Sequence, residues 1–559
     1  MYGTLAEMAN YDGWTLGGAA VQNGRAEGGA AVQNGRAMGG SIGQNGKALD
    51  RWLSSFDTVT QDAICVLAPS LCGFVVWALR RAMEEGRGRL YFVARDGYLM
   101  YRLAQIFCRT LGLPVECRYL YCSRYSLRIP AFHLDMESAL DFICRGGIDV
   151  TMEKILNRSG IGSKHRRKVL RMLRLPYAGD EVIPYAKLKE VRRRLAECEY
   201  FMGCVERNSR RRMPELAGYL RQEGLLDGAN AETAGDAPHV GERGGGEQDE
   251  RPAVEEAGPA KAASTDGSDY ALVDSGWTGS MQKTLGEVLM HLGRKEPLKG
   301  YYFGLYELPK GVERDDYAAY YFGPKDGLRA KVHFSNCLFE SVFSAPHGMT
   351  VGYQRSRDGE GRETRRGLGT EQGYGTRQGQ APGQTYVPIL AECLEERCRF
   401  AKWMELCVTV YGEKLANNIK ACAKDRNGAR MGDKNELREA FLGLDVHEFR
   451  DVTRRLFKAF MGSPTRVEAE TFGDLKFSDD VLENALYRTA AKLTEEELVK
   501  NHVWNKALVM LGIRKGLVKE SAWYEGSVAR LGRRNGYHWR MYAAYKYLLY
   551  VRQAGWKRR

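Results

Sequence analysis

The sequence predicts an α/β fold: a parallel sheet with a helical cap insertion and a mostly helical C-terminal region. Two segments, 51–129 and 270–306, alternate apolar runs of strand length with helix-like stretches. The block between them, 138–226, has a helical pattern, as does the chain from 387 onward. Strands that alternate with helices are joined by crossovers in a parallel sheet. We therefore expect the intervening helical block to cover one end of the sheet.

The chain of 559 residues is too long for one compact domain, since a domain has about 150 residues. With 44% hydrophobic residues it can bury a sizeable core. Three 11-residue Gly- and Asn-rich repeats begin at Gly17, and two later segments are rich in Gly with few large apolar residues, which predicts disorder. The expected organisation is a repeat leader at 1–50, the first part of the core at 51–137, a helical cap at 138–226, a disordered linker at 227–268, the second part of the core at 269–353, a disordered insertion at 354–384 and a helical C-terminal domain at 385–559.

The net charge of +13 is compatible with a solvated basic surface or with an anionic ligand. The sequence contains no recognised nucleic-acid module, so nucleic acid is not an expected partner. The 13 cysteines have irregular spacing and no CxxC pair, which favours a reducing cytoplasm. We expect no signal peptide. The apolar run from Ala63 to Leu79 falls short of about 20 residues and contains Pro69, so it predicts a buried helix rather than a transmembrane segment.

Polar side chains follow three runs of strand length. The first run stops at Asp96, the second at Ser123 and the third at Asp274. Ligands of open parallel sheets bind outside the carboxyl ends of the strands, so these residues should converge on one crevice. Two carboxylates and a hydroxyl beside helix N-termini suit magnesium-assisted phosphoryl chemistry. The alternative is that these side chains only cap the helices that follow.

Residues next to these corners are candidates for binding the substrate. Gly97 and Gly276 would allow close backbone approach or a positive φ angle. Trp277 could stack on a sugar or a nucleobase, or it could pack in the core. The full set of substrate-binding candidates is Arg95, Gly97, Ser123, Arg124, Gly276, Trp277 and Thr278.

Two later stretches also contain chemically capable residues. "FESVFSAPHGMTVGY" places Glu340 and His347 near a Pro–Gly turn, where they could form an acid/base pair or where the histidine could be structural. "SAWYEGSVARLG" contains Trp523 and Glu525, and the sequence assigns no role to either residue.

Three motifs resemble a known family. "RLYFVARDGYLM", "RYLYCSRYSL" and "LVDSGWTGSMQKTL" are similar to a bacterial family of predicted hydrolases of the haloacid dehalogenase (HAD) superfamily. The resemblance covers about residues 57–353 and the helical C-terminal half. It implies a Rossmann-like core with a helical cap. Members of that family often occur among genes for surface-polysaccharide synthesis, so the resemblance also implies a role in surface-glycan metabolism.

The sequence departs from the HAD pattern at the expected nucleophile. HAD phosphatases carry DxDxT after the first strand, and "ARDGY" has Ala94 in the first position and Asp96 in the second. An alanine cannot form an aspartyl-phosphate. The most coherent mapping makes Ser123 the phosphate-binding hydroxyl and Asp274 the late acidic metal ligand. In a second mapping, "DSGWT" is the motif and Asp274 is the nucleophile. No phosphate-anchoring lysine is identifiable.

These expectations lead to one functional hypothesis and one alternative. We expect a HAD-like protein that binds a phosphorylated sugar or a nucleotide-sugar, with Mg²⁺ held by Asp96 and Asp274. Both aspartates are the catalytic candidates, and the missing nucleophile leaves open whether hydrolysis occurs. The alternative is a catalytically inactive HAD-like binding or scaffold module that partners a glycosyltransferase.

Overall fold

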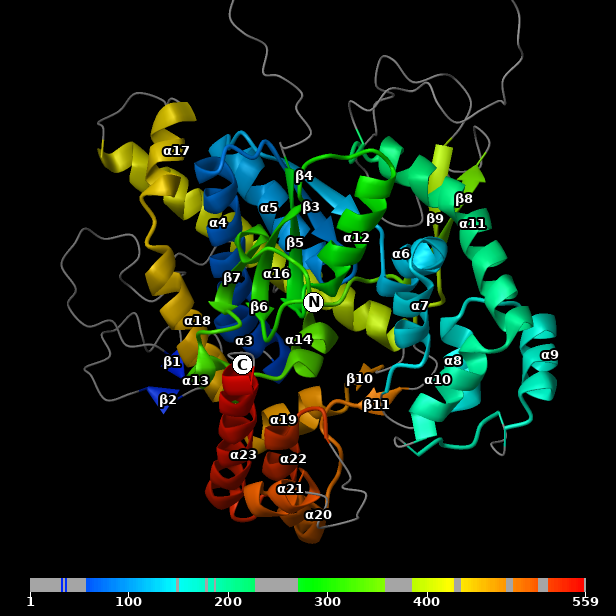
Figure 1. The fold of residues 1–559 in the computed structure, drawn as a ribbon. Coiled ribbons are helices and arrows are strands. Elements are labelled where there is room, and N and C mark those ends of the chain that lie inside the picture. Colours follow the sequence, from blue (N-terminus) through cyan, green and yellow to red (C-terminus); the bar gives the residue numbers. More distant parts are fainter. Residues whose placement is uncertain are drawn as a thin grey trace, which may run out of the picture.

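The centre of the molecule is a five-stranded sheet (Figure 1). The computed structural model describes residues 32–33, 36–37, 57–146, 150–175, 179–184, 187–226, 270–356, 385–426, 434–478, 486–510 and 521–556. The strands of the sheet are β3 (Arg89–Val93), β4 (Glu116–Leu120), β5 (Tyr270–Trp277), β6 (Lys299–Leu305) and β7 (Tyr317–Phe322). All neighbouring strands pair in parallel. The predicted α/β class with a Rossmann-like parallel sheet is therefore confirmed.

The strand order is β4-β3-β5-β6-β7. Along the chain β3 comes first, β4 pairs with one side of it, and β5 pairs with its other side. The order therefore reverses between β3 and β5, and a crevice opens at the carboxyl ends of strands at such a switch point. The helices α5 (Gly97–Leu111) and α12 (Ser280–His291) follow β3 and β5. The residues just after β3 and at the end of β5 consequently border the same crevice.

Side chains of β3 alternate between two hydrophobic layers, as the pleat of a strand requires. Leu90 and Phe92 belong to one core cluster, and Tyr91 and Val93 belong to another. The first cluster includes residues of α4 (Ala68–Glu84), α5, α16 (Glu395–Arg426) and α18 (Val446–Phe460), and the second includes residues of α11 (Glu199–Gln222) and α12. The sheet thus has helices on both faces, the arrangement typical of doubly wound folds.

The apolar run from Ala63 to Leu79 is helical and buried, as predicted. It forms a π-helical turn at Ala63–Leu67 and most of α4, and α3 (Thr58–Asp62) precedes it. In the described part of the chain, Thr58–Glu84 is the one helical stretch long and apolar enough to cross a membrane, and 89% of its most apolar window is buried inside the protein. Its packing against the sheet accounts for the apolar composition.

Between β4 and β5 the chain forms a helical block with a hydrophobic core of its own. Its elements are α6 (Arg124–Ala131), a 3-10 turn at Phe132–Leu134, α7 (Met136–Ile143), α8 (Met152–Arg158), α9 (Ser163–Leu173), α10 (Leu188–Ala196) and α11. Figure 1 shows this block beside the sheet, with α9 and α10 at the edge of the molecule. The helical content expected for 138–226 is therefore present.

After β7 come α13 (Leu328–Val332), α14 (Asn336–Phe343) and an antiparallel pair, β8 (Thr350–Ser356) with β9 (Thr385–Leu390). Residues 354–356, which were expected to open the insertion, belong to β8. The rest of that insertion and the expected linker at 227–268 lie outside the described residues. The same holds for the repeat leader, apart from a two-residue pairing of Val32–Gln33 with Arg36–Ala37.

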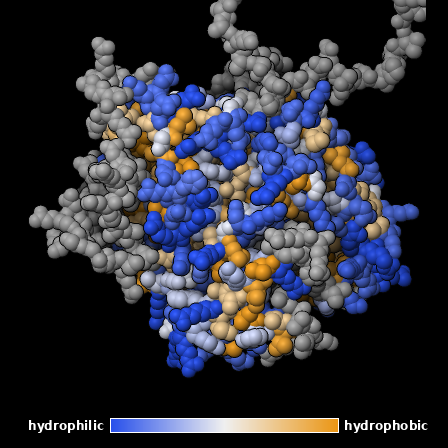
Figure 2. Space-filling model, turned by 60° about the vertical axis from the view of Figure 1, so that its left-hand side comes forward, coloured by the Kyte–Doolittle hydropathy of each residue, from blue (hydrophilic) through white to orange (hydrophobic). Residues whose placement is uncertain are grey.

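The C-terminal region is mostly helical, as predicted. Beyond α16 and α18 it contains α17 (Lys434–Leu442), α19 (Arg466–Gly473), β10 (Lys476–Phe477), β11 (Tyr487–Arg488), α20 (Glu495–Lys500), α21 (Val503–Met510), α22 (Tyr524–Leu531) and α23 (Asn535–Trp556). Figure 1 shows α19 to α23 together below the sheet. The face shown in Figure 2 is mainly hydrophilic, and its hydrophobic residues lie in several patches, one of them in the lower part.

Candidate functional site

A cavity of about 760 Å³ lies at the carboxyl ends of β3 and β5. Asp96, Ser123 and Asp274, the three predicted strand-end residues, all line it. The helical block contributes Arg145 and Arg158 to its wall. The parallel register of β3 with both β4 and β5 brings these distant parts of the sequence together. The predicted convergence on one edge of the sheet is therefore confirmed.

Asp96 does not act as a helix cap. It occupies the N-cap position of α5, but its side chain makes no capping hydrogen bond. Its Oδ2 instead accepts a hydrogen bond from Ser275 Oγ at 2.6 Å. Burial raises the pKa of Asp96, and the hydrogen bond from Ser275 and the charges of nearby arginines lower it in part. The side chain is thus directed across the switch point toward β5.

Asp274 lies within β5, where its side chain is only 9% exposed. Its Oδ1 accepts the backbone N–H of Ser275 at 2.8 Å. Burial raises the pKa of Asp274 to about 8, and the negative charge of Asp96 contributes to the same shift. The two carboxyl groups therefore repel one another when ionised, and a proton or a cation between them would relieve that repulsion.

The hydroxyl of Ser123 is engaged within the fold. It accepts the backbone N–H of Ser126 at 3.0 Å as the N-cap of α6, and the backbone N–H of Ser123 donates in return to Ser126 Oγ at 2.9 Å. Its own proton goes to the carbonyl oxygen of Thr350 at 2.6 Å. A phosphate that bound here would have to displace the Thr350 carbonyl from this proton.

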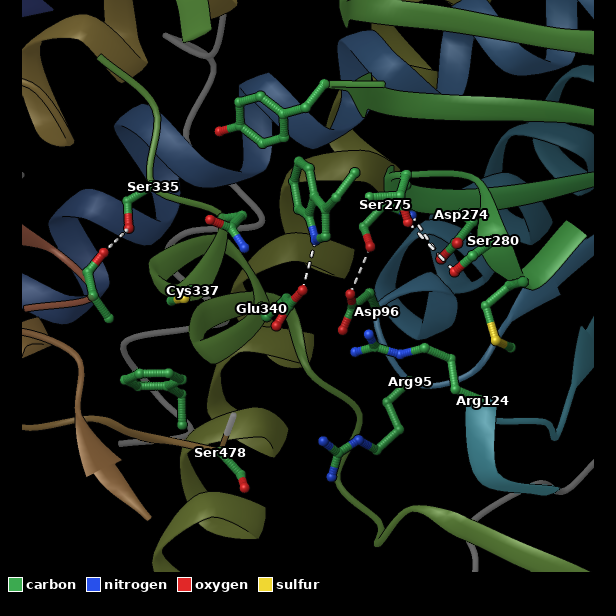
Figure 3. A pocket seen from close by; sticks show the side chains of 18 of the residues that line it. Arg95, Asp96, Arg124, Asp274, Ser275, Ser280, Ser335, Cys337, Glu340 and Ser478 are labelled. Carbon is green, nitrogen blue, oxygen red and sulfur yellow. Dashed lines mark hydrogen bonds between the residues drawn. The ribbon is translucent and has the colours of Figure 1, made fainter. Parts of the chain in front are cut away.

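Arginines surround the carboxylates. Figure 3 shows the side chains of Arg95 and Arg124 on the same side of Asp96. Their charges, with that of Arg397, lower the pKa of Asp96 against the effect of burial. In the adjoining wall, the guanidinium of Arg158 donates to the carbonyl oxygen of Arg145. Guanidinium groups match phosphate oxygens in shape and charge, so this side of the cavity suits an anion.

The two glycine candidates and Thr278 differ in their position relative to the cavity. Gly276 has φ = 107°, and an added Cβ would meet the carbonyl oxygen of Gly304 at 2.4 Å, so only glycine fits there. Gly97 does not line the cavity; it packs against Phe92, whose carbonyl carbon an added Cβ would approach to 3.1 Å. Thr278 does line the cavity, and its hydroxyl donates to Ser280 Oγ at 3.4 Å.

The structure adds Glu340 to the site. Trp277, which has φ = 73°, donates its indole N–H to Glu340 Oε1 at 2.6 Å. A positive φ is rare for a bulky residue, and here it accompanies an indole aimed at a carboxylate. Burial raises the pKa of Glu340 to about 7, and the charge of Asp96 adds to the rise. Glu340 therefore forms a third carboxyl group at the same edge (Figure 3).

Glu340 and His347 do not form an acid/base pair, which was one of the two alternatives for this stretch. His347 does not line the cavity; its Nε2 lies 2.8 Å from the hydroxyl of Tyr119, and its Nδ1 lies 2.8 Å from the carbonyl oxygen of Gly348. Burial lowers the pKa of His347 to about 4, so the ring is neutral at physiological pH. The histidine is structural, which was the other reading of this stretch.

The carboxyl groups can supply only some of the ligands of a Mg²⁺ ion. Among the described residues no group of three or more histidine, cysteine, aspartate or glutamate side chains has the geometry to hold a metal ion. Mg²⁺ in phosphate sites takes only one or two carboxylates and completes its shell with water and phosphate oxygens. Asp96 and Asp274 fit that pattern, because they lie close enough for the negative charge of Asp96 to raise the pKa of Asp274.

Sequence reasoning located the strand-end aspartates but left other cavity residues without a role. Glu525 and Lys546 line the far side of the cavity, more than 200 residues from Asp274 in the chain. No strand-end or turn signal marks such residues, since they lie on helices that reach the cavity through tertiary packing. A comparison with protein-family models finds none that matches this chain, and no curated protein matches it either.

Proposed function

We propose that this protein is HAD-like and binds a phosphorylated sugar or a nucleotide-sugar at the switch point of its sheet, with Mg²⁺ held by Asp96 and Asp274. The observation that carries the proposal is the meeting of these two aspartates in a cavity that arginines also line. An anionic ligand alone would be repelled by the carboxylates, and a cation alone by the arginines. A phosphate ester bound with a divalent cation satisfies both.

The residues of the chain have separate tasks in this proposal. Asp96 and Asp274 would be the protein ligands of the cation, while Arg95 and Arg124 would bind phosphate oxygens. Bound Mg²⁺ would offset the repulsion between the carboxylates and the phosphate. Ser275 holds Asp96 through its hydroxyl, and Trp277 holds Glu340 through its indole N–H. These two contacts fix the carboxyl groups before any ligand arrives.

The helical block would act as a cap in this proposal. Arg145 and Arg158 come from this block and face the cavity. Its separate hydrophobic core would let it move as a unit relative to the sheet. The adjacency of β3, β4 and β5 is also the arrangement that the HAD resemblance requires for its three motifs. The assignment to surface-glycan metabolism rests on that resemblance.

Ala94 bears on whether the protein hydrolyses its ligand or only binds it. It lines the cavity at the place where HAD phosphatases carry their nucleophile, so no aspartyl-phosphate can form there. We propose binding without turnover, in line with a catalytically inactive module that presents its ligand to a partner such as a glycosyltransferase. A cytoplasmic location belongs to this proposal, because irregularly spaced cysteines without a CxxC pair favour a reducing compartment.

Calorimetry with glucose 1-phosphate and UDP-glucose, with and without Mg²⁺, tests the proposal. We expect binding that requires Mg²⁺ and weakens at least about tenfold in Asp96→Asn and in Asp274→Asn. The matched control is Asp315→Asn, an exposed aspartate at the opposite edge of the sheet, just before β7. Binding should also strengthen as the pH rises from 6 to 8, because protons on Asp274 compete with the cation.

Phosphate release from the same ligands distinguishes hydrolysis from binding alone. No release by the wild type supports binding without turnover. Release that disappears in Asp274→Asn but persists in Asp96→Asn would instead make Asp274 the nucleophile. If neither ligand binds and both variants are as stable as the wild type, the proposed site does not exist.

A further inference from the structure

The cavity has a second end, which is built by the C-terminal helices. Figure 3 shows Ser335 and Ser478 at one side and Asp274 with Arg124 at the other, with Glu340 and Asp96 between them. On the Ser335 side the lining comes from α22 and α23 and includes Glu525 and Lys546. A volume of about 760 Å³ lies within the range of sites for drug-sized ligands. The cavity is therefore larger than a phosphate group needs.

A buried ion pair occupies this second end. Glu525 is 4% exposed and Lys546 is 9% exposed. Lys546 Nζ donates to Glu525 Oε1 at 3.1 Å and also to the carbonyl oxygens of Val332 at 3.0 Å and Phe334 at 3.3 Å. Burying two charges usually adds little net stability compared with well-packed apolar side chains. A pair of this kind at the wall of a cavity therefore calls for a second explanation.

The contacts assign different tasks to the two charged groups. An ammonium has three protons, and all three of those on Lys546 have acceptors within the protein. Lys546 is therefore a positioning residue that holds Glu525. A carboxylate has about four acceptor positions, and the bond from Lys546 uses one of them. Glu525 can accept further hydrogen bonds from the hydroxyl groups of a ligand.

An aromatic ring lies beside this carboxylate. Tyr542 also lines the cavity, and its ring stacks on that of Tyr524 with centroids 3.9 Å apart. Lys546 Nζ lies 5.2 Å from the centroid of the Tyr542 ring. Two contacts thus hold this ring in place. A rigid aromatic ring next to a hydrogen-bond acceptor suits a ring that is apolar on its faces and carries hydroxyls at its edge.

We infer that the C-terminal helices form a subsite for a hydroxyl-bearing ring joined to a phosphate, with Glu525 accepting hydrogen bonds from the ring hydroxyls and Tyr542 packing against the ring. This inference rests on the proposed function, in which the phosphate lies at the arginine and carboxylate end. The shared chemistry of the ligand is a furanose or pyranose ring attached to a phosphate. The ring is either the sugar of a sugar phosphate or the ribose of a nucleotide.

The test measures the affinities of inorganic phosphate, glucose 1-phosphate and UDP by calorimetry in Mg²⁺, for the wild type, Glu525→Gln and Tyr542→Leu. We expect both variants to bind at least one of the two ring-bearing ligands about tenfold more weakly and to bind inorganic phosphate as the wild type does. Tyr547→Leu is the control, because Tyr547 is 46% exposed on the same helix and does not line the cavity. Tyr542→Leu keeps the test decisive if Glu525→Gln unfolds.

Each outcome bears on the inference. A loss confined to glucose 1-phosphate makes the ring a sugar, and a loss confined to UDP makes it the ribose. Unchanged affinities for all three ligands overturn the subsite and leave the proposed function in place. An equal loss for inorganic phosphate also overturns it, because the substitutions would then act on the phosphate end. If the wild type binds none of the three, the proposed function fails and the subsite fails with it.

Discussion

Two clusters of buried carboxyl groups in this protein differ in what surrounds them. In the cavity, Asp274 and Glu340 are acids with raised pKa values beside arginines that pull those values down. In the core, Asp62 of α3 and Glu468 of α19 face each other, 7% and 3% exposed. Burial raises the pKa of Asp62 to about 8, and Glu468 adds to the rise.

The second cluster is completed by a proton rather than by a ligand. Asp62 Oδ2 and Glu468 Oε1 are both buried without a donor among the described residues, and the two side chains lie within hydrogen-bonding reach. One proton shared between the two carboxyl groups would satisfy both oxygens. Neither residue lines the cavity. A raised carboxyl pKa therefore marks a candidate functional site only where a cavity and cationic side chains accompany it.

Removing one acid from each cluster should give the largest difference in the free energy of unfolding, because the core acid stabilises the fold and the cavity acid does so much less. Glu468→Ala deletes the partner of Asp62 and also the capping contact to the backbone N–H of Thr465 at 2.5 Å. We expect it to lower the free energy of unfolding by about 3 kcal/mol. Glu340→Ala should lower it by less than about 1 kcal/mol, because water in the cavity can accept from the Trp277 indole. Urea unfolding of both variants measures the difference, and equal losses would contradict the distinction.

The core pair should make the free energy of unfolding fall as the pH rises. The pKa of Asp62 is raised in the folded state to about 8, whereas an unfolded aspartate titrates near about 3.9. Its contribution to stability is therefore fully present below about pH 3.9 and is lost progressively as the pH rises from there through about 8. We expect the free energy of unfolding to fall by about 2 kcal/mol more in the wild type than in Asp62→Asn between pH 6 and pH 8.

Mg²⁺ provides the control for this prediction. Asp274 has a raised pKa of about 8 as well, so it adds a dependence of the same sign. A bound cation would replace the proton on the cavity acids but would not reach the core pair. Urea titrations in saturating Mg²⁺ should therefore keep the Asp62 contribution and lose the Asp274 contribution. Loss of both would mean that the two clusters are coupled.

The sequence alone was sufficient for the parts of the fold that depend on local pattern. Apolar runs that stop at Asp96 and Asp274 predicted strands whose ends meet, because parallel strands share an edge. Glu468 and Asp62 are about 400 residues apart, and no periodicity predicts that pairing. The cavity wall formed by Glu525 and Lys546 was missed for the same reason. Contacts between helices distant in sequence depend on side-chain packing, which a single sequence does not encode in any local pattern.

The smallest expected effect is that of Ser123→Ala, which tests whether the Ser123 hydroxyl only caps α6 or also binds phosphate. Ser123 caps α6 at the cavity and Thr465 caps α19 beside the core pair, each with a reciprocal capping box. Replacing either by alanine should lower the free energy of unfolding by about 1 kcal/mol. Because Ser123 already donates its proton to the Thr350 carbonyl, we expect Ser123→Ala to change the affinity for inorganic phosphate in Mg²⁺ as little as Thr465→Ala does. A tenfold weaker affinity in Ser123→Ala alone would show that the hydroxyl leaves Thr350 to bind phosphate, and the role predicted from the strand-end motif would then hold.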